Sequence, residues 1–253
     1  MKPSATGRIL LWRGGSIWIG VAGEPAGQHA HHAVQIALPF SGGRVRFRVP
    51  SGEWKDYEAA IVAAHQAHEF EARNQFMATL FVEPESREGR ELQRRTRDHG
   101  IAALDAGGQE HQTAALASAY ETRAGDAHLI ALARNAISGI AGSVPTPQQP
   151  GDPRVTRAIE QIRARLGGTI ALGAIAAEVH LSPERFRHLF LDETGVGLRP
   201  YVLWLRLETS LAAYVAGSSL TDAAHAGGFA DSAHLSRTFK KMFGISPASV
   251  RPE

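Results

Sequence analysis

The strongest constraint on the fold is an internal repeat in the C-terminal part of the chain. Its first half recurs at a spacing of 48 residues and its second half at 49, which pairs Leu172 with Leu220, Ala176 with Ala224, Phe190 with Phe239, and Gly195 with Gly244. Each copy is predicted to form a short helix, a tight turn and a longer helix, which is a helix-turn-helix unit. We place the one-residue change in the second turn, at Gly227 and Gly228. Two such units predict an all-helical C-terminal domain.

The signals at the helix ends agree with the repeat. Ser182 followed by Pro183 is typical of a helix start, and Asp231 takes the same place in the second copy. The stretch between the copies, "LRPYVLWLRLETSLAAYVAG", is predicted to be one amphipathic connecting helix. About 19 helical residues span roughly 28 Å, close to the ~34 Å of one turn of B-DNA. One rigid connector can therefore place two second helices in successive major grooves on one face of DNA.

A change of composition divides the chain into domains. The stretch "AGSVPTPQQPGDP", residues 141–153, contains four prolines and two glutamines among small residues and is typical of a linker. Residues 1–84 hold short apolar or alternating runs typical of strands, residues 85–140 a helical pattern, and residues 154–253 the two helix-turn-helix units. We therefore expect an α+β multidomain protein. It has no cysteine, so packing rather than disulfides must stabilise it.

Several motifs of the C-terminal part together resemble the AraC/XylS family of transcriptional regulators. They are "IAAEVHLSPERFRHLF", the Gly-x4-Pro-Tyr element that ends at Tyr201, "RLETSL", and "GGFADSAHLSRTFKKMFGISP", and the resemblance covers Asp152 to Pro252. Two departures are Ser210, where the family more often has alanine, and the Ala223–Ala224 pair, which underfills an apolar position. The resemblance implies sequence-specific binding of double-stranded promoter DNA, contact with RNA polymerase, and a homodimer.

The resemblance also implies which residues face DNA. The groove-facing positions of the family fall on Glu184, Arg185, Arg187 and His188 in the first unit, and on Ser232, Ala233, Ser236 and Arg237 in the second. An arginine reads guanine through paired donors, and a short serine permits close approach. Lys240 and Lys241 are interpreted as phosphate contacts, which position the protein without reading sequence. The alternatives are a solvated helix face for each cation and an all-helical scaffold for the two units.

A histidine-rich stretch in the N-terminal part resembles the first motif of the cupin fold. In "GVAGEPAGQHAHHAVQIALPFSGG" the cupin spacing is kept, with His29 and His31 at ligand positions and Gln35 in place of the usual glutamate. A second motif would centre on "AAHQAHEF", with His68 at its ligand position, but its Pro-x-Gly part is missing. The resemblance implies a cupin-like β-barrel that holds a divalent transition metal such as zinc, nickel or iron. The alternative is a barrel without metal, whose histidines hydrogen-bond a ligand or line the mouth.

Further side chains leave alternatives open. Arg44, Arg46 and Arg48 alternate with apolar residues and share one face of a predicted strand, which is either a solvated outer face or an effector pocket for a carboxylate. His32 points to the opposite face from His31 if the strand is regular, so we do not expect it to be a ligand. The helices of residues 85–140 have Ala/Leu stripes that fit packing against another protomer or packing within the chain.

These features predict a one-component transcriptional regulator, in which a small molecule or metal in the N-terminal domain controls DNA binding by the C-terminal domain. The competing hypothesis is a metal-dependent cupin enzyme, a dioxygenase or isomerase, fused to a DNA-binding domain. Because the metal triad is incomplete and no separate general base or nucleophile is evident, we expect no enzymatic activity. A third possibility is a regulator that needs no ligand.

Composition and charge bear on the location of the protein. Met1–Arg8 lacks the pattern of a signal peptide, and no run approaches the roughly 18 apolar residues of a membrane span. We therefore expect neither export nor a membrane span, and a cytoplasmic protein. The net charge of +2 is too small to argue for a nucleic-acid partner by itself.

Overall fold

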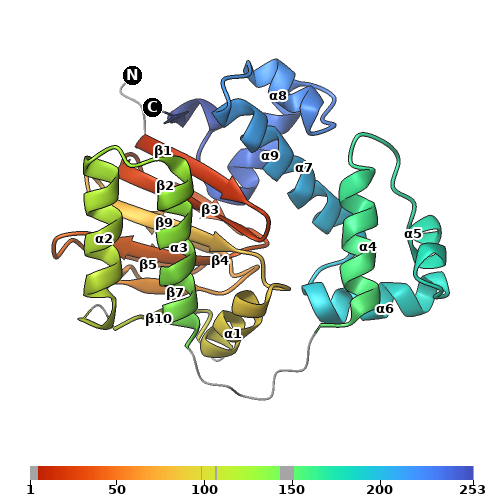
Figure 1. The fold of residues 1–253 in the computed structure, drawn as a ribbon, viewed down its shortest axis with the longest axis horizontal. Coiled ribbons are helices and arrows are strands. Elements are labelled where there is room, and N and C mark those ends of the chain that lie inside the picture. Colours follow the sequence, from red (N-terminus) through yellow and green to blue (C-terminus); the bar gives the residue numbers. More distant parts are fainter. Residues whose placement is uncertain (1–4, 98, 106, 143–150, 253) are drawn as a thin grey trace. The chain divides into compact units, whose positions relative to one another are not determined.

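The structure, a computed structural model, describes residues 5–97, 99–105, 107–142 and 151–252 (Figure 1). It divides into two compact units, the first made of residues 1–144 and 239–253 and the second of residues 145–238. This division differs from the expected one at the C-terminal end, because Phe239–Glu253 group with the N-terminal part. Residues 143–150, the middle of the expected linker, lie outside the described residues.

Two β-sheets form the framework of the first unit. The larger sheet has the order β10-β7-β4-β9-β2-β1-β11, and the smaller has the order β3-β8-β5-β6. All neighbouring strands are antiparallel except β1 and β11. The strands are β1 (Ala5–Trp12), β2 (Gly15–Ala22), β3 (Ala26–His29), β4 (Val34–Pro39), β5 (Val45–Arg48), β6 (Lys55–Tyr57), β7 (Ala60–Val62), β8 (His68–Glu71), β9 (Phe76–Val82), β10 (Ile101–Ala103) and β11 (Val250–Pro252).

The β-rich N-terminal fold is confirmed, but the expected barrel is not closed. No strand pairing among the described residues joins an edge of the larger sheet to an edge of the smaller one, so the strands form two separate sheets. Two strands were not expected. Strand β11 lies in the part predicted to be all-helical, and it pairs in parallel with β1. Strand β10 lies in the region predicted to be only helical, and it extends the larger sheet by pairing with the free edge of β7.

Side chains alternate across the larger sheet, and its two faces have different partners. On β9, Ala78, Leu80 and Val82 belong to a core shared with helices, whereas Met77 and Phe81 point to the other face. Strand β4, "VQIALP", is buried along its whole length because it has an apolar core on each face. The second of these cores contains residues of both sheets, so it lies between them.

Three helices cover one face of the larger sheet: α1 (Arg87–Thr96), α2 (Glu110–Glu121) and α3 (Asp126–Ala141). Figure 1 shows α2 and α3, in green, lying across the strands. Their apolar stripes are buried against the sheet through Leu116 of α2 and Leu129, Ala133 and Ile137 of α3. These stripes therefore pack within the chain, which is one of the two alternatives that the sequence left open.

The second unit is helical, as the repeat predicts. Its helices are α4 (Pro153–Ala164), α5 (Leu172–Glu178), α6 (Pro183–Thr194), α7 (Leu198–Val215), α8 (Leu220–Ala226) and the first part of α9 (Ser232–Phe243). The predicted N-caps are present: the side chain of Ser182 accepts a hydrogen bond from the backbone N–H of Arg185, and Asp231 from that of His234. In the described ranges, no helix combines the length and the apolar composition that a membrane crossing requires.

The turns of the two helix-turn-helix units locate the extra residue of the second copy. The backbone N–H of Leu181 donates to the carbonyl of Ala176 in the first copy, and that of Phe229 donates to the carbonyl of Ala224 in the second, each at 2.9 Å. These equivalent bonds are still 48 residues apart at the end of the turn. The extra residue is therefore Ala230, which follows the turn and precedes the N-cap.

The expected position of the extra residue, at Gly227 and Gly228, is therefore wrong. Gly228 has a direct counterpart in His180, because both lie in the left-handed region, with φ of 74° and 55°. The glycine pair suggested an inserted turn residue. In the structure, however, the turn of each copy requires one residue in the left-handed region, and Gly228 fills that position in the second copy.

The departure at Ser210 lies against Gly227, and nothing in the structure requires a serine there. Ser210 lies on α7 and is 1% exposed, and its hydroxyl has no hydrogen-bond partner among the described residues. A Cβ added at Gly227 would collide with this hydroxyl and with the backbone carbonyl of Arg206. The close approach of α7 to the start of the second turn therefore requires glycine at position 227, but it does not require the serine.

We expect opposite effects from substitutions at these two positions. Ser210→Ala removes a buried hydroxyl without a partner and raises the local free energy of unfolding by about 1 kcal/mol. Gly227→Ala forces α7 and α8 apart and lowers it by roughly 1–3 kcal/mol. Hydrogen exchange of the α7 and α8 amides in the full chain measures both changes. Equal destabilisation by the two substitutions would contradict this account of the packing.

Candidate functional site

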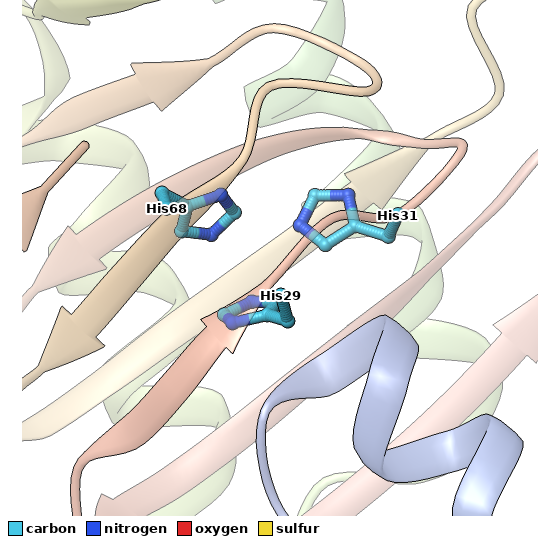
Figure 2. A group of neighbouring side chains, drawn as sticks. All are labelled: His29, His31 and His68. Atoms are coloured by element: carbon cyan, nitrogen blue, oxygen red, sulfur yellow. The ribbon is translucent and has the colours of Figure 1, made fainter. Parts of the chain in front are cut away.

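Three histidines that are distant in the sequence meet in the first unit. His29 ends β3, His31 lies in the loop after it, and His68 begins β8, where it is the cross-strand partner of His29. Figure 2 shows the three rings pointing toward one another. One ring nitrogen of each lies within 4.8 Å of the other two, and the side chains are 6%, 2% and 0% exposed, respectively.

The backbone fixes the protonation of all three rings in the same way. The Nδ1 atom of His29 lies 2.7 Å from the carbonyl of Gly27, and the Nδ1 atoms of His31 and His68 lie 2.8 Å from the carbonyls of Ala33 and Gln66. A carbonyl oxygen only accepts hydrogen bonds, so each Nδ1 must carry the hydrogen. In a neutral ring, the Nε2 atom then has a free lone pair. This is the arrangement by which proteins orient metal-binding histidines.

Gln35 is the fourth member of the cluster. It lies on β4 with its side chain toward the smaller sheet, and its Oε1 atom is 2.9 Å from Nε2 of His31 and 3.2 Å from Nε2 of His68. With both Nδ1 atoms protonated, these contacts bring three acceptors together without a hydrogen between them. Two arrangements relieve the conflict: a cation between the acceptors, or a rotated amide whose NH₂ group donates to both histidines.

The histidines are held in the uncharged form. Burial and repulsion from His29 lower the pKa of His31 to about 3, and burial together with the other two rings lowers the pKa of His68 to about 2. Burial also lowers the pKa of His29. Neutral imidazole is the form that binds metal, so no proton has to be displaced from Nε2 near neutral pH.

The donor set fits a divalent transition metal. Three imidazole nitrogens and one amide oxygen suit zinc, nickel or iron, and the second motif supplies its ligand His68 although its Pro-x-Gly part is missing. The structure thus brings together the four residues that the sequence selected as candidate ligands. His65, three residues before His68, adopts a left-handed backbone with φ of 64°.

His32 belongs to a separate cluster, in keeping with the expectation that it is not a ligand of this site. Its Nε2 atom lies 3.0 Å from a carboxylate oxygen of Glu85, and its Nδ1 atom lies 3.3 Å from Nε2 of His65. Sequence reasoning missed Glu85, which comes just before α1. Glu85 is recognised as a partner of His32 only from their proximity in the structure, because no sequence motif links the two residues.

A cavity of about 120 Å³ adjoins the histidine cluster. Its walls include His29 and Gln35 from the cluster and the apolar side chains of Trp18, Met77 and Phe81. The indole N–H of Trp18 is buried and has no acceptor among the described residues. The cavity therefore joins an apolar wall to the nitrogen-rich cluster, and no sequence motif pointed to it because its walls come from several strands.

The three alternating arginines lie on the outer side of β5, away from this cavity. Arg48 makes two hydrogen bonds to the Glu69 carboxylate, at 3.0 and 2.7 Å, and Arg44 pairs with Glu58. Arg46 pairs with Asp56 and Glu71, and the Trp54 ring contacts the guanidiniums of Arg46 and Arg48 at 5.4 and 4.9 Å. None of the three lines the described cavity, so this placement gives no support to a carboxylate pocket built from them.

The candidate DNA-contacting residues of the first helix-turn-helix unit are exposed on α6. Arg185, Arg187 and His188 reach solvent, as does Glu184. The Glu184 carboxylate accepts hydrogen bonds from Arg187 at 2.6 Å and from His188 at 2.9 Å, and these bonds lower the pKa of Glu184. Arg187 and His188 are therefore held by one carboxylate.

The candidates on α9 have no such partner carboxylate in the contacts that the structure describes. Ala233, Arg237, Lys240 and Lys241 are exposed, and Ser232 and Ser236 are half-buried. The hydroxyl of Ser236 donates to the carbonyl of Ser232 at 2.8 Å, so its free acceptor lone pairs face outward. α9 therefore presents small residues and unpaired cations, whereas α6 presents an ion-paired cluster.

Comparison with known proteins supports the helical part directly. A family model described as a helix-turn-helix domain matches residues 175–253. The chain is 28% identical over 95 residues to the Msm operon regulatory protein of Streptococcus mutans, covering 36% of this chain and 34% of that protein. It is 31% identical over 104 residues to the uncharacterised HTH-type transcriptional regulator YidL of Escherichia coli K12, covering 41% of this chain and 35% of that protein. The chain thus spans about a third of the length of these relatives.

The solved structure of ToxT from Vibrio cholerae O395 is similar over nearly the whole chain. The likeness covers 93% of this chain and 94% of that one, with a TM-score of 0.54 and 11% identity, so it concerns the fold. It extends the agreement from the helix-turn-helix region to the β-rich part in front of it. Residues 175–253 thus match a helix-turn-helix domain, and the chain shares the fold of ToxT over nearly its whole length.

Proposed function

We propose that the chain is a sequence-specific DNA-binding regulator of transcription, whose activity responds to an effector bound in the first unit. The observation that carries the DNA-binding part is the pair of capped helices α6 and α9, which expose arginines, lysines and small residues at the positions where this family contacts DNA. The names of the curated relatives, both regulators, favour this function over a metal-dependent enzyme.

In this proposal α7 acts as a rigid spacer between the two reading helices. It runs from Leu198 to Val215 and is 18 residues long, which corresponds to about 27 Å at 1.5 Å per residue. That length allows α6 and α9 to enter successive major grooves. Arg237 then reads a base, while Lys240 and Lys241 contact phosphates.

The effector site of the proposal is the histidine cluster, which holds a divalent transition metal through His29, His31 and His68, with Gln35 as a further donor. The observation that carries this part is the convergence of three buried imidazoles, with one ring nitrogen of each within 4.8 Å of the others and each ring oriented by a hydrogen bond from Nδ1 to the backbone. When bound, the metal crosslinks β3, the following loop and β8. It thereby favours one arrangement of the first unit over others, and this difference in affinity is what shifts DNA binding.

Three finer points rest on the resemblance to AraC/XylS proteins alone. They are that two copies act together as a homodimer on paired half-sites, that the bound protein contacts RNA polymerase, and that it works in the cytoplasm. Because the chain spans only about a third of the length of the curated relatives, the activity of the whole protein is also part of this proposal.

Substitutions on α9 test the DNA-binding assignment. We expect Arg237→Ala to weaken binding to the promoter region of the protein's own gene by roughly 1–3 kcal/mol and to relax the preference at one base pair. Lys241→Ala should lower affinity evenly for all sequences and reduce the slope of log K against log salt by about 1. Fluorescence anisotropy titrations with matched and scrambled duplexes separate these effects. If neither variant changes binding, α9 does not face DNA in this way.

Glu184 is expected to restrain DNA binding by α6. Glu184→Gln releases Arg187 and His188 and should raise the affinity for unrelated DNA roughly threefold at low salt, because more cations reach the phosphates. Asp192→Asn on the same helix is the matched control, since it removes the same charge from an exposed residue without releasing an arginine. An equal rise in both variants would show that net charge, and not the ion pair, sets the affinity.

Metal content tests the effector site. The full chain, loaded with Zn²⁺ and passed through gel filtration, should retain about one equivalent by elemental analysis. His31→Ala or His68→Ala should weaken metal binding by more than about a hundredfold, because a direct ligand matters more than the outer-shell groups that cost 10–100-fold. His128→Ala, which removes an exposed histidine of α3, is the control. Retention of the metal by both site variants would rule out this site.

A further inference from the structure

The four donors of the histidine site carry no negative charge. His29, His31 and His68 are neutral rings, and Gln35 is an amide. Among the described contacts, the three rings hydrogen-bond only backbone carbonyls and Gln35, and no carboxylate contacts them. The Glu85 carboxylate hydrogen-bonds His32 in the separate cluster, and Glu24, which lines the adjoining cavity, is exposed to solvent.

A divalent cation at this site would therefore keep its full charge in a buried place. His31 and His68 are 2% and 0% exposed, so little water reaches them to solvate the ion. Burying an uncompensated charge costs free energy unless an opposite charge accompanies it. A glutamate at position 35 would supply that charge from the protein. With Gln35, the compensating charge has to arrive with a ligand.

The space for such a ligand is the cavity next to the cluster. It reaches His29 and Gln35 at one end, and its apolar walls include Trp18, Met77 and Phe81. Its volume of about 120 Å³ approaches that of the roughly 150 Å³ cavity known to accept benzene.

We propose that the effector is a small organic anion with an apolar body about the size of one aromatic ring, which binds the metal through its anionic group and fills the cavity with its body. This inference rests on the metal site of the proposed function. Anion and metal then bind cooperatively, because each neutralises the charge that makes the other costly to bury. Each therefore raises the affinity of the site for the other.

Gln35 has two positions in this scheme. Without metal, its NH₂ group donates to the Nε2 atoms of His31 and His68 and satisfies both lone pairs. With metal, the amide rotates and its oxygen faces the cation, as in the orientation that places Oε1 2.9 Å from His31. The metal-free site is thus already hydrogen-bonded, which lowers the affinity for metal alone.

The test uses the full chain loaded with Co²⁺, whose visible absorption reports a change of ligand at the metal. Phenylacetate, acetate and the neutral phenylacetamide are titrated separately. We expect phenylacetate to change the spectrum and to bind at least tenfold more tightly than acetate, which has the same charge but no apolar body. Phenylacetamide should leave the spectrum unchanged. Equal affinities for phenylacetate and phenylacetamide would overturn the proposal.

Two variants test separately the effect of charge compensation at the metal and the effect of cavity volume. Gln35→Glu supplies the missing charge, so it should bind Co²⁺ at least tenfold more tightly without any anion and bind phenylacetate at least tenfold less tightly. Thr79→Phe narrows the cavity from β9, away from the metal, so it should lose the preference for phenylacetate over acetate and keep its Co²⁺ affinity. If Gln35→Glu binds both ligands as the unmodified chain does, charge compensation is not the basis of the site.

The outcomes distinguish a failure of the proposed metal site from a failure of the proposed anionic effector. If the unmodified chain binds no Co²⁺ at the three histidines with any of the three compounds present, both the metal site and the anion are wrong. If Co²⁺ binds and is lost in His31→Ala, but none of the compounds changes the spectrum, the metal site stands and the anionic effector is wrong.

Discussion

The alternation of side chains along the middle strands of the larger sheet is the constraint on which the rest of the first unit depends. In β9 and β4, one set of residues enters the core under the helices and the other set points toward the smaller sheet. Gln35 and Phe81 belong to the second set, so they reach the histidines and the cavity. A shift of one residue in the register would exchange the two sets and turn Gln35 and Phe81 toward the helices, away from the histidines.

The histidine cluster combines rigid backbone hydrogen bonds with an unusual absence of charge. Each ring is oriented by a carbonyl only two residues away, so the orientation depends on the local chain and on few other contacts. The replacement of a carboxylate by Gln35 leaves the cluster neutral. Because the metal-free site is neutral and its polar groups are hydrogen-bonded to one another, it suits reversible binding of a metal. Reversible binding is the property that a sensor needs.

The sequence predicted the helix-turn-helix pair, the caps at Ser182 and Asp231, and the four residues of the histidine cluster, because these features have a local period or a fixed spacing. It could not predict contacts that depend on distant partners. The open sheets, the added strand β10, and the pairing of His32 with Glu85 follow from which strand edges and side chains meet in space. The position of the extra residue at Ala230 was missed because glycines at a turn look alike in sequence whether they are inserted or equivalent.

The central claim is that three imidazoles bind one metal in the first unit, and X-ray absorption spectroscopy of the zinc-loaded full chain tests it most directly. The account predicts a coordination shell with three imidazole nitrogens at about 2.0–2.1 Å and at least one oxygen, with the multiple-scattering pattern of histidine rings. A shell made only of oxygens, or one with fewer than three imidazoles, would contradict it.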